Sequence, residues 1–355
     1  MTPERIWWEQ IGSSIRLIDT IAAALEDEQS LVLRIPDGLP WRDGFYKTLD
    51  IRMSAIAADR QLRRLKWNCH EEPGEFILRR LCPQEVQANY YPGQSIPAYL
   101  SSLDNLVLSD CYIWISDVYE RDDICKWISF INDYRPVESD SSRKAIFIIE
   151  YAGPQVETGR TRTVEFRVEE YNCKVFCLEL AYELKNTDVP VYQAELAHAM
   201  GERNPEFGTL LLNWGEDFLK DPVFIAQTIL EHSVNSVGRA FEPAETTFLE
   251  SCIRRANMVT LYPILEQVRI SCIMRHEEQL RNCLPIKNSN GETITEPYEL
   301  ELGGLCHIIT NGMHIFYGDE IDRLRVCKKV RNLIAHNRSI EFEDVKRILG
   351  YVKRK

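Results

Sequence analysis

The sequence predicts two domains: an α/β domain with a mostly parallel sheet at residues 1–238, and an all-helical domain at residues 239–355. The α/β domain is predicted by near-continuous apolar strands that alternate with helical segments, the pattern of a parallel sheet covered on both faces. The helical domain is predicted by apolar residues that recur at steps of three and four beyond residue 243.

The first part of the chain contains a helix, a strand, a turn and a second helix. Residues 5–29 repeat isoleucine and leucine along one face and predict a helix. Leu31–Ile35 is a short apolar strand, and Pro36–Pro40 has the composition of a turn. Residues 42–58 predict the helix that follows.

Three further strands are predicted in the same half of the chain. Glu75–Leu78 is a weak one, whereas Cys111–Asp117 and Lys144–Glu150 are long apolar runs. A helix at residues 122–134 separates the two strong strands, which places them in parallel in one sheet.

The boundary between the domains follows a change of pattern. Residues 164–168 alternate and predict a strand with one wet face, and residues 175–180 predict another strand. Residues 189–232 are helical in pattern, and the polar segment 235–243 is the predicted boundary. Beyond it, a short last helix follows four predicted helices at residues 244–257, 261–284, 300–311 and 319–336, which together indicate a helical bundle.

The strand, turn and helix at residues 31–58 stand where a nucleotide-binding protein would place its phosphate loop. That loop needs glycines followed by Lys and Ser or Thr, but Pro36–Gly44 has no Gly-Lys pair and two prolines that lack a backbone donor. A working Walker A loop is therefore absent, no cofactor is expected, and an ATP-driven enzyme is the least favoured function. The order of elements is still similar to a P-loop NTPase sheet, of the STAND type, that has lost its nucleotide site. Asp117 and Glu150, which end two strands, are then structural residues.

The most informative segment is the predicted helix from Asp319 to His336. One face is apolar, formed by Leu324, Val326, Cys327, Val330, Leu333 and Ile334. The other face carries a polar stripe at steps of four, three and four residues, formed by Arg325, Lys329, Asn332 and His336. Arg331 is expected to project from the border of this stripe, and Asn337 is a predicted helix stop.

The side chains at the end of this helix suit RNA cleavage. A histidine titrates near neutrality and can move a proton to or from a 2′-hydroxyl or a leaving 5′-oxygen. An arginine can hold a phosphate as negative charge builds on it, and an asparagine can orient either group. This chemistry needs no metal. Looser pairs such as Arg269 and His276 lack the asparagine and carry no weight.

Arg331-Asn332-x-x-Ala335-His336 resembles the signature of the HEPN family (higher eukaryotes and prokaryotes nucleotide-binding). The resemblance covers residues 244–350 and includes Glu301–Leu305, which opens a helix, and Ser339–Asp344, which leads into the last one. Family members are all-helical, many are RNases of antiviral defence and toxin systems, and they usually dimerise and join two motifs into one site.

The resemblance implies a metal-independent endoribonuclease that cleaves single-stranded RNA as a regulated toxin or antiviral-defence effector. Arg331 and His336 would be catalytic and Asn332 supportive, while the RNA-binding residues would be Arg325, Lys328, Lys329 and Arg338. A homodimer through the helical domain is expected, with other defence-system proteins as further partners. The alternative is a non-catalytic dimerisation or scaffold subunit of a prokaryotic defence complex, in which His336 only caps the helix and Arg331 pairs with an acid.

Composition sets the remaining expectations. The net charge is −12, yet residues 321–355 hold 11 Lys and Arg against 4 Asp and Glu, so this segment carries +7 and the rest −19. The basic segment fits an RNA-facing surface, although it fits docking on an acidic surface of this chain or a partner equally well.

The 11 cysteines show no CxxC pair, which predicts reduced thiols in the cytoplasm and no metal site. No run is long enough to span a membrane.

Overall fold

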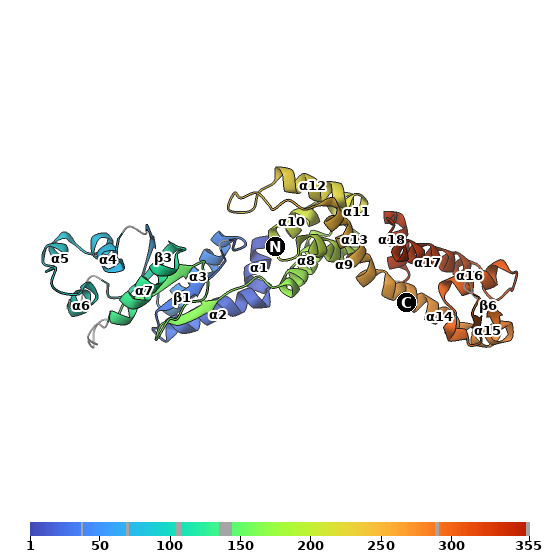
Figure 1. Cartoon of the computed structure of the whole chain (residues 1–355), viewed down its shortest axis with the longest axis horizontal. Coiled ribbons are helices and arrows are strands. Elements are labelled where there is room, and N and C mark those ends of the chain that lie inside the picture. The colour runs from blue at the N-terminus through green and yellow to red at the C-terminus, as the bar shows by residue number, and fades with distance from the viewer. Residues whose placement is uncertain (37, 69–70, 104–107, 135–143, 288–290, 353–355) are drawn as a thin grey trace. The chain divides into compact units, whose positions relative to one another are not determined.

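A computed structural model describes residues 1–36, 38–68, 71–103, 108–134, 144–287 and 291–352 of the chain. The chain divides into two units, Met1–Asn172 and Cys173–Lys355 (Figure 1). This division lies before the boundary that the sequence predicted after Gly238, because helices within residues 190–232 pack with the helix at residues 246–260.

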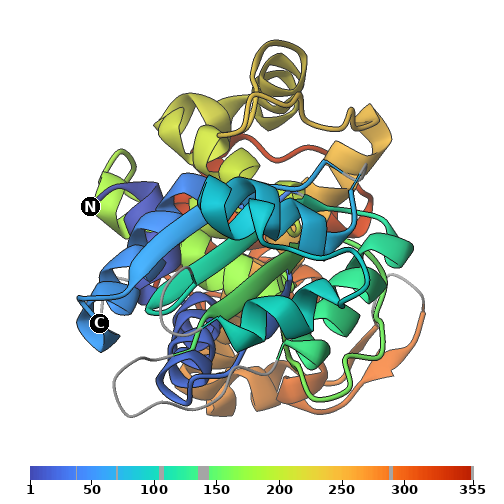
Figure 2. The same ribbon diagram turned by 90° about the vertical axis from the view of Figure 1, so that its left-hand side faces the viewer.

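The N-terminal unit is built on one sheet of five strands that lie side by side (Figure 2). All neighbours are parallel, in the order β2-β3-β4-β1-β5. The strands are β1 (Leu31–Arg34), β2 (Gln61–Lys66), β3 (Cys111–Val118), β4 (Ile146–Tyr151) and β5 (Arg162–Glu165). The predicted α/β architecture with a mostly parallel sheet is therefore confirmed.

Seven helices are described in this unit before α8: α1 (Pro3–Gln10), α2 (Gly12–Glu26), α3 (Arg42–Ile56), α4 (Pro73–Leu81), α5 (Gln84–Ala88), α6 (Ile96–Ser102) and α7 (Arg121–Asp133). On one face of the sheet, Ile113 and Phe147 share a core with Trp127 of α7. On the other face, Trp114 meets Phe45 of α3 edge-on, with ring centroids 6.2 Å apart. Both faces are covered, which explains why β3 and β4 are mainly apolar, with polar residues only near their carboxyl ends.

Three predictions in this unit need correction. The single helix expected at residues 5–29 is two helices, α1 and α2, because Ile11 between them is extended (φ −79°, ψ 124°). Residues 75–78 belong to helix α4, which begins at Pro73, a residue that favours the first turn of a helix. The sequence missed β2, a charged strand at the edge of the sheet.

The C-terminal unit begins within α8 (Glu170–Leu184), so the strand predicted at residues 175–180 is wrong. The helical pattern of residues 189–232 is confirmed as α9 (Pro190–Gly201), α10 (Pro205–Asn213), α11 (Gly215–Lys220) and α12 (Pro222–His232). Helix α9 is joined to the helix after the predicted boundary by side-chain hydrogen bonds. Tyr192 Oη donates to Asn257 Oδ1 at 2.8 Å, and Arg255 Nη2 donates to the Ala199 carbonyl at 3.2 Å.

The last part of the chain contains α13 (Thr246–Thr260), α14 (Tyr262–Arg275), α15 (Glu277–Cys283), the 3-10 turn η1 (Pro297–Glu299), α16 (Leu302–Thr310), α17 (Asp319–Ala335) and α18 (Phe342–Gly350). Helix α17 packs against α14, α16 and α18 (Figure 1). The predicted helices are present, with residues 261–284 divided into α14 and α15. A short antiparallel pair that the sequence did not predict, β6 (Ile286–Lys287) and β7 (Thr293–Ile294), precedes η1.

None of the ten cysteines that the structure describes forms a disulfide, and eight of them are buried. No helix within the described ranges is both long and apolar enough to cross a membrane.

Candidate functional site

The motif helix α17 ends where the sequence predicted, in a geometry that fixes the position of its last residues. Asn337 has a left-handed backbone (φ 53°), and its N–H donates to the Ile334 carbonyl at 3.1 Å. The Arg338 N–H donates to the Leu333 carbonyl at 2.9 Å. These two bonds form a Schellman motif, in which asparagine tolerates the left-handed position. His336 therefore occupies the C-cap of a helix with a defined end.

Arg331 lies beside a cavity at one side of α17, and its guanidinium also reaches Asn332 of the polar stripe. It follows the buried Val330 and lines a cavity of about 200 Å³. The cavity is formed by α14, the 297–302 segment and α17, and its lining residues are Tyr262, Leu265, Glu266, Arg269, Tyr298, Glu299, Glu301, Leu302 and Arg331. The hydrogen bond from Arg331 to Asn332 is compatible with the expected place of Arg331 at the border of the stripe, which stays a prediction.

The guanidinium of Arg331 has two partners. Its Nη2 pairs with Glu301 Oε2 at the start of α16, and its Nη1 donates to Asn332 Oδ1 at 3.2 Å. Arg331 is about one-third exposed, and Glu301 is two-thirds exposed. The arginine is therefore partly open to solvent but neutralised within its own chain.

His336 lies elsewhere on α17. It is exposed and does not line the cavity of Arg331. Five helical positions correspond to a rotation of about 140° and a rise of about 7.5 Å, so the two side chains leave the helix in different directions. The structure brings Arg331 and Asn332 together. His336 lies one turn beyond Asn332, to whose carbonyl its backbone N–H donates at 3.0 Å, and its side chain is exposed.

The four expected RNA-binding residues differ in solvent exposure and in ion pairing. Arg325 and Arg338 are exposed, and Arg325 is 3.9 Å from Asp322 in a loose pair on the helix surface. Lys328 is half-buried. Lys329 Nζ pairs at 2.6 Å with Asp344 Oδ2, a nearly buried carboxylate in the first turn of α18. Lys329 thus connects α17 to α18, and its positive charge is paired with the carboxylate of Asp344. The basic tail at residues 353–355 lies outside the described residues.

Three residues of the cavity were missed by sequence reasoning. Tyr262 and Tyr298 are both 44% exposed at its edge. Arg269 and His276 lack the asparagine of the motif, so nothing in the sequence was a reason to select Arg269. Its Nη1 donates to the carbonyls of Tyr298 and Leu300 at 3.0 and 2.8 Å. No local pattern links these residues, because they meet only through the packing of α14 against the segment before α16.

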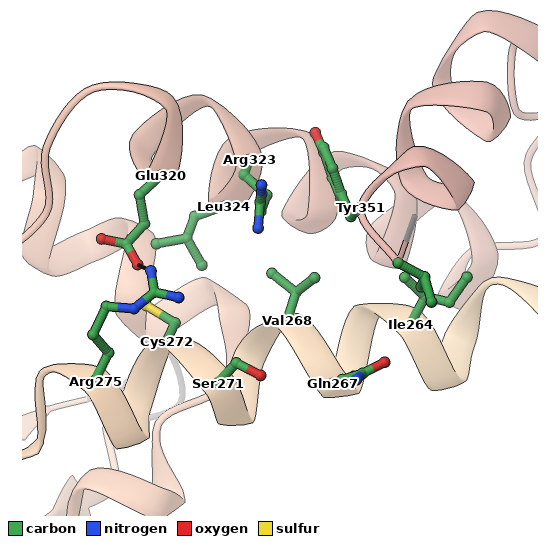
Figure 3. A pocket seen from close by; sticks show the side chains of 11 residues that line it. Ile264, Gln267, Val268, Ser271, Cys272, Arg275, Glu320, Arg323, Leu324 and Tyr351 are labelled. Atoms are coloured by element: carbon green, nitrogen blue, oxygen red, sulfur yellow. Dashed lines mark hydrogen bonds and ion pairs between the residues drawn. The ribbon is translucent and has the colours of Figure 1, made fainter. Parts of the chain in front are cut away.

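A second cavity, of about 170 Å³, lies between α14 and α17 (Figure 3). In it, Arg275 pairs with Glu320 at 2.7 Å, and the guanidinium of Arg323 lies 4.8 Å from the ring centroid of Tyr351. Burial raises the pKa of the Cys272 thiol, at the edge of this cavity, to about 12. None of the expected catalytic or RNA-binding residues lines this cavity.

The N-terminal unit holds a buried charge at the carboxyl end of β4. Glu150 is 3% exposed and pairs with Arg42, the first residue of α3. Its carboxylate also accepts hydrogen bonds from Tyr46 Oη at 2.8 Å and Trp114 Nε1 at 3.0 Å. The start of α3, where a phosphate loop would lead into the helix, is therefore occupied by an internal ion pair, which accounts for Glu150 as a structural residue.

Among the residues that the structure describes, no group of three or more His, Cys, Asp or Glu side chains is arranged to hold a metal ion. No protein-family model matches the chain, and no curated protein matches it. Two solved structures of mutants of RuvB from Thermotoga maritima are similar to this chain at 13% and 11% identity, with TM-scores of 0.32 and 0.33. They cover 89% and 87% of this chain and the same shares of their own. TM-scores this low give no basis for an argument about fold or function.

Proposed function

We propose that the C-terminal unit is a metal-independent endoribonuclease of the HEPN type, which cleaves single-stranded RNA as a regulated toxin or antiviral-defence effector. The observation that carries the proposal is the end of α17. There, Arg331 donates a hydrogen bond to Asn332, and His336 is exposed to solvent at the C-cap. The Schellman motif fixes the last turn of the helix. Exposed Arg325 and Arg338 supply positive charge for the RNA backbone nearby.

In the proposed reaction the imidazole of His336 removes the proton of a ribose 2′-hydroxyl. The 2′-oxygen attacks the adjacent phosphorus and the bond from phosphorus to the 5′-oxygen breaks. The 5′-oxygen takes up a proton from water, and the imidazolium of His336 returns its proton to the solvent. Arg331 stabilises the negative charge on the phosphate oxygens, and Asn332 orients the guanidinium. The products are a 2′,3′-cyclic phosphate and a 5′-hydroxyl.

The directions of Arg331 and His336 favour a site that needs two chains. Within one chain the two side chains leave α17 about 140° apart, and Arg331 is already paired with Glu301. In a homodimer, His336 of one protomer can act on the phosphate that Arg331 of the other protomer holds. The N-terminal unit then controls or recruits the enzyme.

The first experiment incubates the purified chain with labelled single-stranded RNA in EDTA, beside His336→Ala and Arg331→Ala. His232→Ala is the matched control, because His232 is also an exposed histidine at the C-terminal end of a helix. Cleavage by the wild type and by the control, and none by the two site variants, is expected. Equal cleavage by all four proteins refutes the proposal.

A second experiment tests whether the site is shared between chains. His336→Ala and Arg331→Ala are unfolded together, mixed and refolded, so that about half of the dimers contain one chain of each kind. Each mixed dimer has one complete site of the two in the wild type, which gives about one quarter of the wild-type rate. A rate that stays at the level of the separate variants contradicts a shared site.

The second candidate function is a non-catalytic dimerisation or scaffold subunit. The pair between Arg331 and Glu301 and the C-cap position of His336 favour it, since a structural role for the motif predicts both. Under this function the chain binds a partner equally well with and without His336→Ala, and neither protein cleaves RNA.

A further inference from the structure

The cavity beside Arg331 combines apolar walls with partly exposed aromatic residues. Leu265 and Leu302 give it apolar walls, and the rings of Tyr262 and Tyr298 remain 44% exposed at its edge. Large aromatic side chains are usually buried more fully than this, and exposed rings beside an arginine are typical of sites where single-stranded bases stack.

The ring of Tyr298 is held in position before any ligand arrives. Arg269, whose side chain is 15% exposed, fixes the backbone on both sides through its bonds to the carbonyls of Tyr298 and Leu300. The Tyr298 hydroxyl donates to Glu277 Oε2 at 3.2 Å. A side chain that is already ordered loses little freedom when a ligand binds, so the arrangement favours binding.

The carboxylates around the cavity are mostly engaged within the protein. Glu266 pairs with Arg269 at 2.5 Å, and Glu299 accepts the backbone N–H groups of Thr295 and Glu296 at 3.1 and 3.3 Å. Glu301 instead pairs with Arg331, and it is the more exposed partner of that pair. A phosphate that enters beside a stacked base can therefore take the place of Glu301 on the guanidinium.

We propose that Tyr262 and Tyr298 form a stacking subsite for one nucleobase of single-stranded nucleic acid, next to the phosphate that Arg331 holds. Arg269 is a positioning residue of this subsite. That the natural ligand is RNA rests on the proposed function, whereas the stacking subsite is inferred from the residues that line the cavity. Stacking accepts any base, so binding is expected to depend little on sequence.

The test uses the full chain and a fluorescent single-stranded 2′-deoxy oligonucleotide, which lacks the 2′-hydroxyl and is not cleaved by the proposed reaction. Its affinity is measured by anisotropy in EDTA for the wild type, Tyr262→Ala and Tyr298→Ala. Each alanine variant is expected to bind about 5- to 150-fold more weakly. Tyr262→Phe keeps the ring and is expected to bind within about twofold of the wild type. Tyr298→Phe keeps the ring but loses the hydroxyl bond to Glu277, so it is expected to bind slightly more weakly than the wild type and much more tightly than Tyr298→Ala.

Tyr91→Ala is the control for loss of an exposed tyrosine, because Tyr91 lies in the other unit and is 75% exposed. Circular dichroism with thermal unfolding verifies that each variant is folded. Weak binding by the alanine variants together with near-normal binding by the phenylalanine variants and normal binding by the Tyr91 variant supports the subsite. No binding by the wild type, or equal binding by all the variants, overturns it.

The outcome separates this proposal from the proposed function. If the alanine variants lose the oligonucleotide while the wild type never cleaves RNA, the subsite stands and the ribonuclease proposal is refuted. If the wild type cleaves RNA and the alanine variants bind and cleave as it does, the ribonuclease stands and the subsite is refuted.

Discussion

Glu301→Gln is the substitution that tests most directly how Arg331 is used. The change removes one negative charge and keeps the size of the side chain, so Arg331 loses its ionic partner without a new cavity. Glu301 is the N-cap residue of α16 but makes no capping hydrogen bond through its side chain, so the helix loses no cap. If a phosphate of the nucleic acid must displace Glu301 from Arg331, the substitution strengthens the binding of a single-stranded oligonucleotide.

The expected size of the effect follows from the exposure of the pair. Arg331 is 34% and Glu301 68% exposed, which places the pair among surface salt bridges worth about 0.2–1 kcal/mol. Removing a competitor of that strength raises the affinity for a single-stranded oligonucleotide about 1.4- to 5-fold. The gain is expected to shrink as salt is added, because the displaced pair is itself screened.

The assay is the anisotropy titration in EDTA, at constant ionic strength, with Glu343→Gln as the control. Glu343 is exposed in the first turn of α18 and does not line the cavity, so its substitution gives the same change in net charge. An equal gain in both variants would mean a general charge effect. Unchanged or weaker binding by Glu301→Gln would refute the view that Glu301 occupies the phosphate position.

Four further outcomes are expected. Glu150→Ala leaves the partly buried Arg42 without its partner and lowers the free energy of unfolding of the N-terminal unit by about 3 kcal/mol, measured by denaturant titration. Asn337→Val places a β-branched residue at φ 53°, so it destabilises the end of α17 by about 1–2 kcal/mol and lowers RNA cleavage without touching His336. Burial raises the pKa of the Cys272 thiol to about 12, so iodoacetamide at pH 8 labels exposed Cys125 in the folded chain and Cys272 only after unfolding, as mass spectrometry can show. Because the raised pKa of Cys272 belongs to the folded state, its contribution to stability is complete below about pH 9 and is lost as the pH rises toward 12.

The sheet was predictable where its strands are buried on both faces. The runs at Cys111–Asp117 and Lys144–Glu150 gave β3 and β4 within one or two residues, because such strands are mainly apolar. β2 was missed since it is an edge strand with Arg63, Arg64 and Lys66, and charges at an edge discourage pairing with other chains. An edge strand of this kind has no periodicity that a sequence can reveal.

Short apolar runs misled the prediction in two places. Residues 75–78 and 175–180 are apolar enough for buried strands, yet both belong to helices, α4 and α8. A run of four to six apolar residues does not distinguish the two, and the deciding signals lie outside it. Pro73 begins α4, and Arg79 and Arg80 occupy its last turn, which is the charge distribution that a helix favours.

The candidate site was only partly predictable for a related reason. The period of α17 and its stop at Asn337 are local properties, so the sequence predicted both. The direction of Arg331 depends on which side of α17 the neighbouring helices cover, which is a property of the tertiary fold. The aromatic edge of the cavity joins Tyr262 and Tyr298, 36 positions apart, through the hydrogen bonds of Arg269.

The divided arrangement of Arg331 and His336 suggests how a ribonuclease of this kind would be controlled. In a single chain the arginine is neutralised by Glu301 and the histidine lies on another side of the helix, so a lone protomer is expected to have little activity. Activity then requires a second copy of the chain and a phosphate that outcompetes Glu301. Both requirements depend on concentration, and neither needs an inhibitory contact from the N-terminal unit. The initial rate should therefore rise with the square of protein concentration below the dissociation constant of the dimer and linearly above it. A rate that is linear throughout, from a chain shown to be monomeric at the lowest concentration, would place catalysis within one protomer and remove this form of control.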